Sequence, residues 1–379
     1  MSEPPVVLVV FGTRPEAIKL APVIAALRAS TRLAARLCAT AQHRELLDRM
    51  LAVFGIRPDC DLDVMTRGQS LADVAARVLS GLRPVLEAER PAAVLVQGDT
   101  TTAMAGALAA FYAGVRVGHV EAGLRTGRLD QPFPEEMNRR LVTQLATWHY
   151  APTSRAADQL RREGIDEARI LVTGNTVVDA LTAAAARALP LPAAVGGAAL
   201  TGRRLLVVTG HRRESFGAGL AALCEALCAL ARRFDDVLIV YAVHANPAVE
   251  GPVRERLGGQ PRILLTPPLD YLDFVALMRR AHLIITDSGG VQEEAPTFGV
   301  PVLVTRATTE RSEALEAGVA RLVGSDRDAI TAAATALLTD AAAHAAMRAT
   351  VNPFGDGHAA ERIAAHLEAT LAGTPKGAR

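Results

Sequence analysis

Short apolar runs alternate with longer amphipathic stretches along most of this chain. The first apolar run, Val6–Phe11, has the length of a buried strand, and the stretch that follows, Pro15–Ala29, has the length of a helix. Strands that alternate with helices predict βαβ units, in which parallel strands form a sheet that helices cover. The chain is therefore expected to fold as an α/β protein.

The alternation runs twice along the chain. The first series predicts strands Val6–Phe11, Ala34–Thr40, Ala93–Gln97, Val115–Glu121 and Trp148–Ala151, with helices Pro15–Ala29, Arg44–Phe54, Leu71–Glu89, Thr101–Ala113 and Pro134–Ala146. The second predicts strands Leu205–Thr209, Val237–Val243, Arg262–Leu265, Leu283–Thr286 and Pro301–Val304, with helices Gly219–Phe234, Pro247–Leu257, Leu272–Arg280, Val291–Phe298 and Ala359–Leu371. A stretch rich in proline and glycine, from Leu189 to Gly202, is predicted as a surface connection.

The length of the chain points to two domains, because 379 residues are too many for one ordinary core. Each series then predicts its own doubly wound, Rossmann-like domain. Two such domains facing each other are expected to form a cleft lined by strand ends, a place for an extended ligand with two different halves.

Composition limits the partners that we expect. The formal net charge of +1 gives no electrostatic reason for binding nucleic acid or a membrane surface. The run Val6–Phe11 is too short for a signal-peptide core or a membrane span, so a cytoplasmic protein is expected. The four cysteines, Cys38, Cys60, Cys224 and Cys228, lack the paired spacing of zinc ligands and are interpreted as buried thiols.

Three carboxylates stand at or near predicted strand ends. Asp99 follows strand Ala93–Gln97, Glu121 closes strand Val115–Glu121, and Glu135 begins the helix after it. The carboxyl ends of parallel strands are where open α/β sheets bind ligands, so converging acids suggest proton transfer. Each acid also has a plainer explanation, since Asp99 suits a helix N-cap and acids are favoured in a first helical turn.

Basic residues stand at other predicted strand ends. Arg14 lies in the turn after the first strand, beside a helix N-terminus that favours anions, and is interpreted as a phosphate or sugar contact; the alternative is an ion pair with Glu16 or another acid. His211 ends one strand of the second series, where an imidazole can contact phosphate or transfer a proton; His244 ends the next strand and is equally compatible with a structural role. Lys19 is the only lysine apart from Lys376; it either serves as a compact point charge or is retained by chance.

The segment Thr286–Glu294 predicts an anion site in the second domain. A strand ends, Ser288, Gly289 and Gly290 expose backbone N–H groups, and a helix begins. Glu294 is placed to hold ribose hydroxyls, and Arg311 adds a guanidinium near the same strand ends. Neither the dinucleotide fingerprint nor a P-loop is present, so the pattern favours a nucleoside diphosphate over NAD or ATP.

Several of these motifs, in this order, resemble the non-hydrolysing UDP-N-acetylglucosamine 2-epimerase family. They are Phe11–Lys19, Gly98–Thr102, Gly118–Thr126, Gly210–Glu214 and Asp287–Glu294, and the likeness runs from about Val6 to the last helix. The resemblance implies a glycosyltransferase-B type fold, with a first domain of residues 1–173 plus 358–379 and a second of 174–357. It also implies that the C-terminal helix returns to pack on the first domain.

The resemblance further implies a reaction. The family interconverts UDP-GlcNAc and UDP-ManNAc without NAD, metal or other cofactor. A base removes the C2 proton, UDP leaves from C1 in an anti elimination that forms 2-acetamidoglucal, and UDP adds again. A homodimer is expected on the same basis.

The family's functional residues carry over by motif. The acid/base set is Asp99, Glu121, Glu135 and His211, and the nucleotide or sugar contacts are Arg14, Lys19, Asp99, Glu121, His211, Leu269, Phe274, Ser288, Gly289, Gly290, Glu294 and Arg311. Leu269 stands where related members have Gln, which leaves a backbone contact there, and Ser312 stands where Pro is usual. A second, activating UDP-GlcNAc site would use Gln42, Gln69, Arg212 and His244, but Glu45 and Gly68 depart from the regulated pattern.

Other activities share parts of this pattern. An epimerase for a related UDP-amino sugar or uronic acid is the nearest alternative, followed by a hydrolysing epimerase that releases ManNAc. A UDP-sugar glycosyltransferase would need the anion site but not three acids in the first domain. A non-catalytic UDP-sugar sensor gives no reason for Asp99, Glu121 and Glu135 together.

Overall fold

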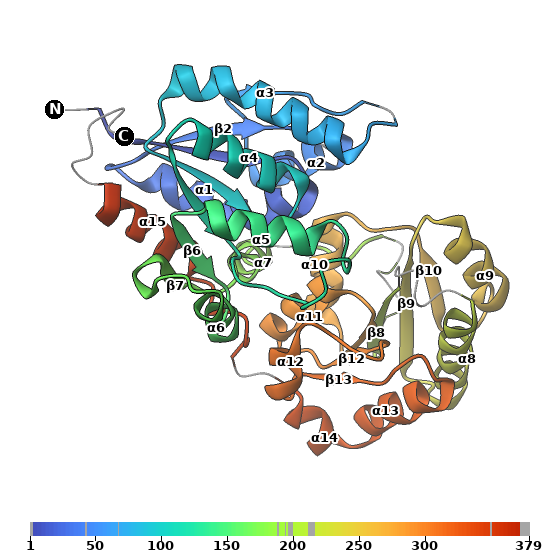
Figure 1. Ribbon diagram of the computed structural model, residues 1–379. Helices are drawn as coiled ribbons and strands as arrows, with labels where there is room; N and C mark the ends of the chain where they lie inside the picture. The colour runs from blue at the N-terminus through green and yellow to red at the C-terminus, as the bar shows by residue number, and fades with distance from the viewer. Residues whose placement is uncertain are drawn as a thin grey trace. The chain divides into compact units, whose positions relative to one another are not determined.

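The computed structural model describes residues 3–41, 44–66, 68–187, 189–193, 195, 200–210, 217–348 and 351–371. Contacts divide the chain into two compact units, drawn in Figure 1. Unit 1 holds the chain up to Ala180 and from Phe354 onward, and unit 2 holds Leu181–Pro353. Among these residues, none of the helices has the length and apolar character needed to cross a membrane.

Unit 1 is built on a seven-stranded parallel sheet with the order β3-β2-β1-β4-β5-β6-β7. Its strands are β1 (Val6–Phe11), β2 (Ala34–Ala39), β3 (Cys60–Asp61), β4 (Ala93–Gln97), β5 (Arg116–Val120), β6 (Trp148–Ala151) and β7 (Ile170–Val172). The order reverses between β1 and β4, which pair in parallel. Such a reversal leaves a crevice beyond the strand ends, where doubly wound folds bind ligands.

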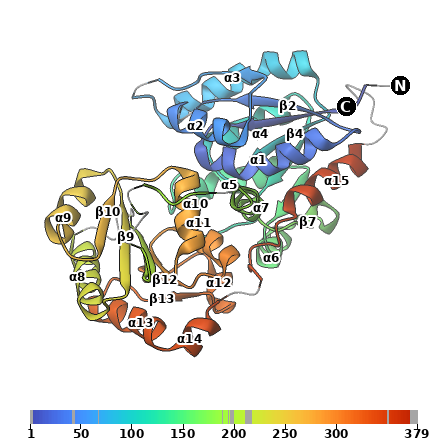
Figure 2. The ribbon, with the colours of Figure 1, turned by 180° about the vertical axis from the view of Figure 1, so that it is seen from behind.

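Helices cover both faces of this sheet. They are α1 (Arg14–Ala29), α2 (Arg44–Phe54), α3 (Leu71–Glu89), α4 (Thr101–Tyr112), α5 (Glu135–Leu145), α6 (Ser154–Arg162) and α15 (Ala359–Leu371), while α7 (Thr176–Ala185) crosses the boundary between the units. Figure 1 shows α3, α4 and α5 in front, and they share one core with the strands beneath them. Figure 2, from behind, shows α15 beside α1, which confirms that the C-terminal helix returns to the first domain.

Unit 2 repeats the same architecture with the order β10-β9-β8-β11-β12-β13. Its strands are β8 (Arg204–Gly210), β9 (Val237–Val243), β10 (Ile263–Thr266), β11 (Leu283–Thr286), β12 (Val302–Val304) and β13 (Ala320–Leu322). Its helices are α8 (Ala218–Arg233), α9 (Pro247–Leu257), α10 (Tyr271–Arg280), α11 (Gly289–Glu294), α12 (Ser312–Glu316), α13 (Arg327–Thr339) and α14 (Ala341–Ala346). The prediction of two doubly wound α/β domains is confirmed.

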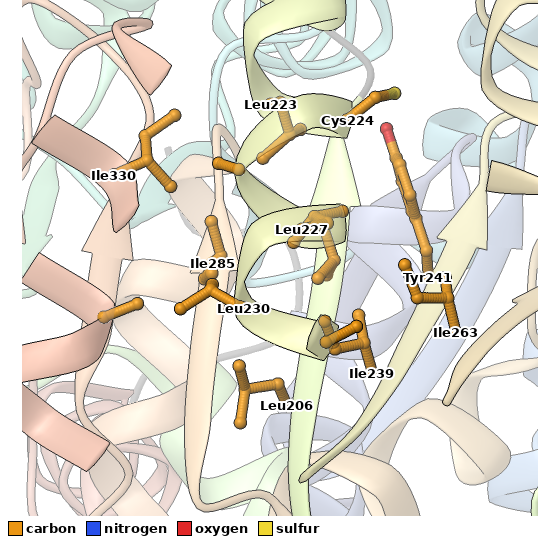
Figure 3. Close-up of a cluster of buried hydrophobic side chains, with 14 of the residues drawn as sticks. Leu206, Leu223, Cys224, Leu227, Leu230, Ile239, Tyr241, Ile263, Ile285 and Ile330 are labelled. Atoms are coloured by element: carbon orange, nitrogen blue, oxygen red, sulfur yellow. The ribbon is translucent and has the colours of Figure 1, made fainter. Parts of the chain in front are cut away.

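The core of unit 2 explains why its elements form. Leu206, Ile239 and Ile285 project from three neighbouring strands onto α8, as Figure 3 shows. Leu223 and Leu227 lie four residues apart on α8 and meet them, since that spacing puts both on one helical face. Burying each such side chain contributes about 1.5–3 kcal/mol, so the apolar pattern selects these elements.

Most predicted elements are confirmed to within one or two residues, while others have no counterpart in the predictions. The unpredicted elements are β3, α6, β7, α7, β13 and α12–α14, together with a 3-10 turn at Glu167–Arg169. Strands β7 and β13 have three residues each, too few to show a period of two. The predicted helix Val291–Phe298 is instead the short α-helix α11 followed by a 3-10 turn, Ala295–Phe298.

Candidate functional site

Polar side chains gather at the carboxyl ends of β1, β4 and β5 in unit 1. Glu121 directly follows β5 and is only 9% exposed. Its Oε1 accepts from Lys19 Nζ and, at 3.2 Å, from Asn175 Nδ2, while its Oε2 accepts from Gln97 Nε2. The residue has φ +67°, a left-handed conformation that is rare outside glycine. Three donors, one of them charged, hold this carboxylate in one orientation.

Asp99 does not cap helix α4, so that interpretation of this acid is wrong. The N-cap is Thr100, whose Oγ1 accepts from the backbone N–H of Ala103 at 3.0 Å. The Asp99 carboxylate instead accepts from Arg139 of α5, and its backbone oxygen accepts from Asn138 Nδ2 at 2.9 Å. The two partners from α5 fix both the turn and the acid that it carries.

The acid pair at the start of α5 divides into two environments. Glu136 is completely buried; it accepts from the Thr126 backbone N–H at 3.1 Å and from Arg140 at 3.2 Å, and lies 3.4 Å from Arg139. Glu135 is half-buried, and its buried Oε2 has no hydrogen-bond partner among the described residues. Glu136 therefore holds the loop and helix together, whereas Glu135 keeps an oxygen for another partner.

The turn after β1 carries Arg14 and differs from expectation in its electrostatics. Glu16 Oε2 accepts from the backbone N–H groups of Gly12 and Thr13 at 2.9 and 2.7 Å, and its Oε1 accepts from Thr100 at 2.6 Å. Burial raises the pKa of Glu16. Glu16 already accepts from the backbone N–H groups of Gly12 and Thr13 at this helix start, so they are not available to an anion. An anion at this turn would therefore be attracted by the charge of the half-buried Arg14 itself.

His119 lies beneath these acids, on β5. It is completely buried, and its Nε2 lies 2.8 Å from the carbonyl oxygen of Gly98, in the turn before Asp99. Burial lowers the pKa of His119 to about 3. The neutral ring therefore donates to that carbonyl and supports the turn that carries Asp99.

The predicted anion site of unit 2 surrounds the start of α11. Ser288 is its N-cap residue and donates its backbone N–H to Thr286 Oγ1 at 2.9 Å. A Cβ added at Gly289 would lie 3.0 Å from the guanidinium carbon of Arg311, so a side chain there would press on that group. Arg311 donates to Glu293 at 2.9 Å and to Glu310 at 2.8 Å, which orient it beside the glycine.

The other predicted contacts have separate locations. Gly290 and Glu294 lie in α11, Phe274 is half-buried in α10, and Leu269 is half-buried before that helix. His244 follows β9 and accepts from the Asn246 backbone N–H at 3.1 Å, while half-buried Gln69 lies before α3 and accepts from Thr66 at 3.0 Å. His211, Arg212 and Gln42 lie outside the described residues.

Sequence reasoning missed the polar residues that hold the acids. Gln97, Arg139 and Asn175 contact Glu121 or Asp99 and were not singled out. Only Asn175 carried a readable signal, because an Asn before the apolar run Val177–Leu181 is a good N-cap candidate. That signal predicts a helix start and not a contact with Glu121.

The chain matches known proteins over nearly its whole length. A family model described as UDP-N-acetylglucosamine 2-epimerase matches residues 25–368. A UDP-N-acetylglucosamine 2-epimerase of Yersinia pestis is 51% identical over 363 residues, which cover 94% of this chain and 96% of that protein.

Solved structures also match the chain over nearly its whole length. The UDP-GlcNAc 2-epimerase of Neisseria meningitidis bound to UDP-GlcNAc has a TM-score of 0.87 and 43% identity, covering 96% of this chain and 99% of that one. A glycotransferase of kitacinnamycin, 16% identical, with a TM-score of 0.66 and covering 97% of this chain and all of that one, shares the fold alone.

Proposed function

The chain belongs to the UDP-N-acetylglucosamine 2-epimerase family, and from this premise we propose that it interconverts UDP-GlcNAc and UDP-ManNAc. The observation that best supports the proposal is the pair of held carboxylates on neighbouring strand ends. Glu121 is oriented by three donors and Asp99 by Arg139, whereas acids that only capped helices would need neither arrangement.

The chemistry explains why such acids are required. The C2 hydrogen of the sugar lies beside no ketone and is weakly acidic, so a positioned carboxylate must remove it. Breaking the C2–H and C1–O bonds forms the C1=C2 double bond of 2-acetamidoglucal and releases UDP. Protonation of C2 from the opposite face, with return of UDP to C1, completes the inversion. Positioned proton transfer of this kind is worth about 10²–10⁴-fold in rate.

The proposed roles follow the two units. Asp99, Glu121 and Glu135 of unit 1, with His211 of unit 2, are assigned to proton transfer, and Arg14 and Lys19 to contacts with the sugar nucleotide. The UDP contacts proposed for unit 2 are Leu269, Phe274, Ser288, Gly289, Gly290, Glu294 and Arg311. Backbone donors and Arg311 would stabilise the negative charge that develops on departing UDP.

Incubation of the purified protein with UDP-GlcNAc in D₂O, followed by NMR, tests the activity. The expected product is UDP-ManNAc with deuterium at C2, formed without added NAD or metal. Release of free ManNAc would identify a hydrolysing epimerase instead. No turnover of UDP-GlcNAc would refute the substrate, and UDP-linked uronic acids and amino sugars would then be tried.

A homodimer, a cytoplasmic location and activation by UDP-GlcNAc complete the proposal. Exposed apolar side chains on two packed helices, Phe111 and Tyr112 of α4 with Met137 and Leu141 of α5, support a subunit interface. Light scattering at defined concentrations measures the assembly, and a monomer would refute it. Activation through Gln42, Gln69, Arg212 and His244 predicts sigmoidal initial rates at low UDP-GlcNAc, and linear rates would count against it.

A further inference from the structure

We propose that Asn175 is a positioning residue that connects the catalytic carboxylate of Glu121 to two segments of unit 1, one just before α7, the helix in which the chain leaves this unit, and one where the chain re-enters it. These segments are residues 173–175 and 354–356, called here the crossover pair. The inference rests on the proposed function of Glu121 and adds a residue and a connection to it.

The side chain of Asn175 has a defined orientation. It is 2% exposed, and its Oδ1 accepts from the backbone N–H of Val177 at 3.1 Å, at the start of α7. The amide can satisfy that N–H only with its oxygen, so its nitrogen must face the other way. There Nδ2 donates to Glu121 Oε1 at 3.2 Å. One side chain therefore begins a helix and holds the acid.

The backbone of Asn175 belongs to the crossover pair. Its N–H donates to the carbonyl oxygen of Phe354 at 2.7 Å. The two segments touch closely, since a Cβ added at Gly355 would lie 3.2 Å from Asn175 N and one added at Gly174 would lie 3.3 Å from Gly355 Cα. Arg362 joins both segments by donating to Thr173 O and Asp356 Oδ1, each at 2.8 Å.

A short hydrogen-bonded connection therefore runs from the crossover pair to Glu121. It passes from Phe354 through the backbone of Asn175 to the carboxylate, with a hydrogen bond at each end. Lys19 from α1 forms an ion pair with Glu121, and neutral His119 lies on β5, the strand that precedes Glu121. Asn175 adds a neutral donor, so loss of its amide changes the placement of the carboxylate without removing a charge.

The substitution Asn175→Asp separates this role from helix capping. Aspartate caps helices as well as asparagine does, so the bond to Val177 N–H survives. It lacks the NH₂ donor and places a second carboxylate against Glu121, which disfavours ionisation of the pair. We expect kcat to fall about 10–100-fold at neutral pH because the base is misplaced. The acid limb of the kcat/KM profile should move up by about one pH unit or more.

The matched control is Asn246→Asp. Asn246 caps α9 in unit 2 by accepting from the Ala248 backbone N–H at 2.9 Å, and it is not among the proposed substrate contacts. Both variants should keep the UDP dissociation constant within about twofold, measured by calorimetry. Only Asn175→Asp should change kcat and the pH profile. An unchanged acid limb with kcat within twofold of wild type would overturn the inference.

The crossover pair is tested by Gly355→Ala. Gly355 has φ +152°, and its added methyl would press on Asn175 N, so kcat should fall at least fivefold while UDP binding persists. Gly251→Ala, where a Cβ meets open space, is the control. If Gly355→Ala does not fold, Asn175→Asp still decides whether Asn175 positions Glu121. A Gly355→Ala enzyme with wild-type kcat would refute the link to the crossover pair.

A substrate-independent measurement separates this inference from the proposed function. The ¹³C-carboxyl signal of Glu121 is assigned with Glu121→Gln and titrated by NMR in wild type, Asn175→Asp and Asn246→Asp. A titration shifted to higher pH in Asn175→Asp alone supports the positioning role even if UDP-GlcNAc is not turned over. Identical titrations in an active wild-type enzyme and Asn175→Asp would overturn the role and leave the proposed function intact.

Discussion

The ion pair between Lys19 and Glu121 should be strongly coupled in unfolding measurements. The side chains are 16% and 6% exposed, so both charges have lost most of their water. Lys19→Met keeps the aliphatic stem but leaves the Glu121 carboxylate without its counter-charge. Removing one partner of a fully buried pair costs about 3–5 kcal/mol, and the residual exposure of Lys19 lowers this to about 2–3 kcal/mol.

Substitution of the other partner, Glu121, should cost less unfolding free energy. Glu121→Gln keeps a hydrogen-bonding side chain, and the remaining ammonium can reach water, so we expect a loss of about 1–2 kcal/mol. Once the first substitution has removed the ion pair, the second substitution has no pair left to remove. The double variant should therefore lose less unfolding free energy than the sum of the two single losses. The resulting coupling energy is expected to be about 1–2 kcal/mol.

Trp148 provides the fluorescence signal by which this coupling energy can be measured in unit 1. It is the only tryptophan of the chain, is 8% exposed and lies in β6, so its fluorescence reports urea unfolding around that sheet. The control pair is Arg83 and Glu87 on α3, which are 81% and 67% exposed and 3.6 Å apart. Its coupling should be about 0–0.5 kcal/mol. A Lys19–Glu121 coupling no larger than this would refute the view that the pair is desolvated.

Three further outcomes are expected. Gly118→Ala should destabilise unit 1 by roughly 1–3 kcal/mol by the same Trp148 assay, because its Cβ would lie 2.5 Å from Leu95 Cδ2. Burial lowers the pKa of His119 from 6.5 to about 3, so the unfolded state takes up a proton first as pH falls, and stability is lost between about pH 6.5 and 3. His119→Gln should reduce the slope of unfolding free energy against pH in this range by up to about 1.4 kcal/mol per pH unit. An unchanged slope would contradict the prediction. Asp99→Asn should retain UDP binding by calorimetry while losing turnover; near-wild-type rates would remove Asp99 from the mechanism.

Asp99 illustrates how far local sequence rules reach. The rule that Asp, Ser, Thr and Asn cap helices holds at Ser70, whose hydroxyl accepts from the Asp73 N–H at 3.2 Å. At the turn after β4, Asp99 and Thr100 are both good caps in consecutive positions. Helix starts are uncertain by a residue or two from sequence, so the rule could not choose between them. The choice of Thr100 leaves Asp99 to meet Arg139.

The residues that hold the Glu121 carboxylate could not be predicted by local sequence rules, for a different reason. Lys19 and Asn175 lie 102 and 54 positions from Glu121 in the chain, yet both reach its Oε1. A contact over that separation depends on strand order and on the path of the chain between strands. Neither is visible in the spacing of residues within one motif.

The sequence by itself determined the alternation of strands and helices, the two doubly wound units and the acids that follow β4 and β5. These follow from apolar periodicity and turn chemistry, which act over a few residues. Only the tertiary structure decided what those acids contact: Arg139 for Asp99, and Lys19, Gln97 and Asn175 for Glu121. The physical reason is that a buried carboxylate must find donors wherever the packed chain brings them, and packing joins segments that local patterns cannot relate.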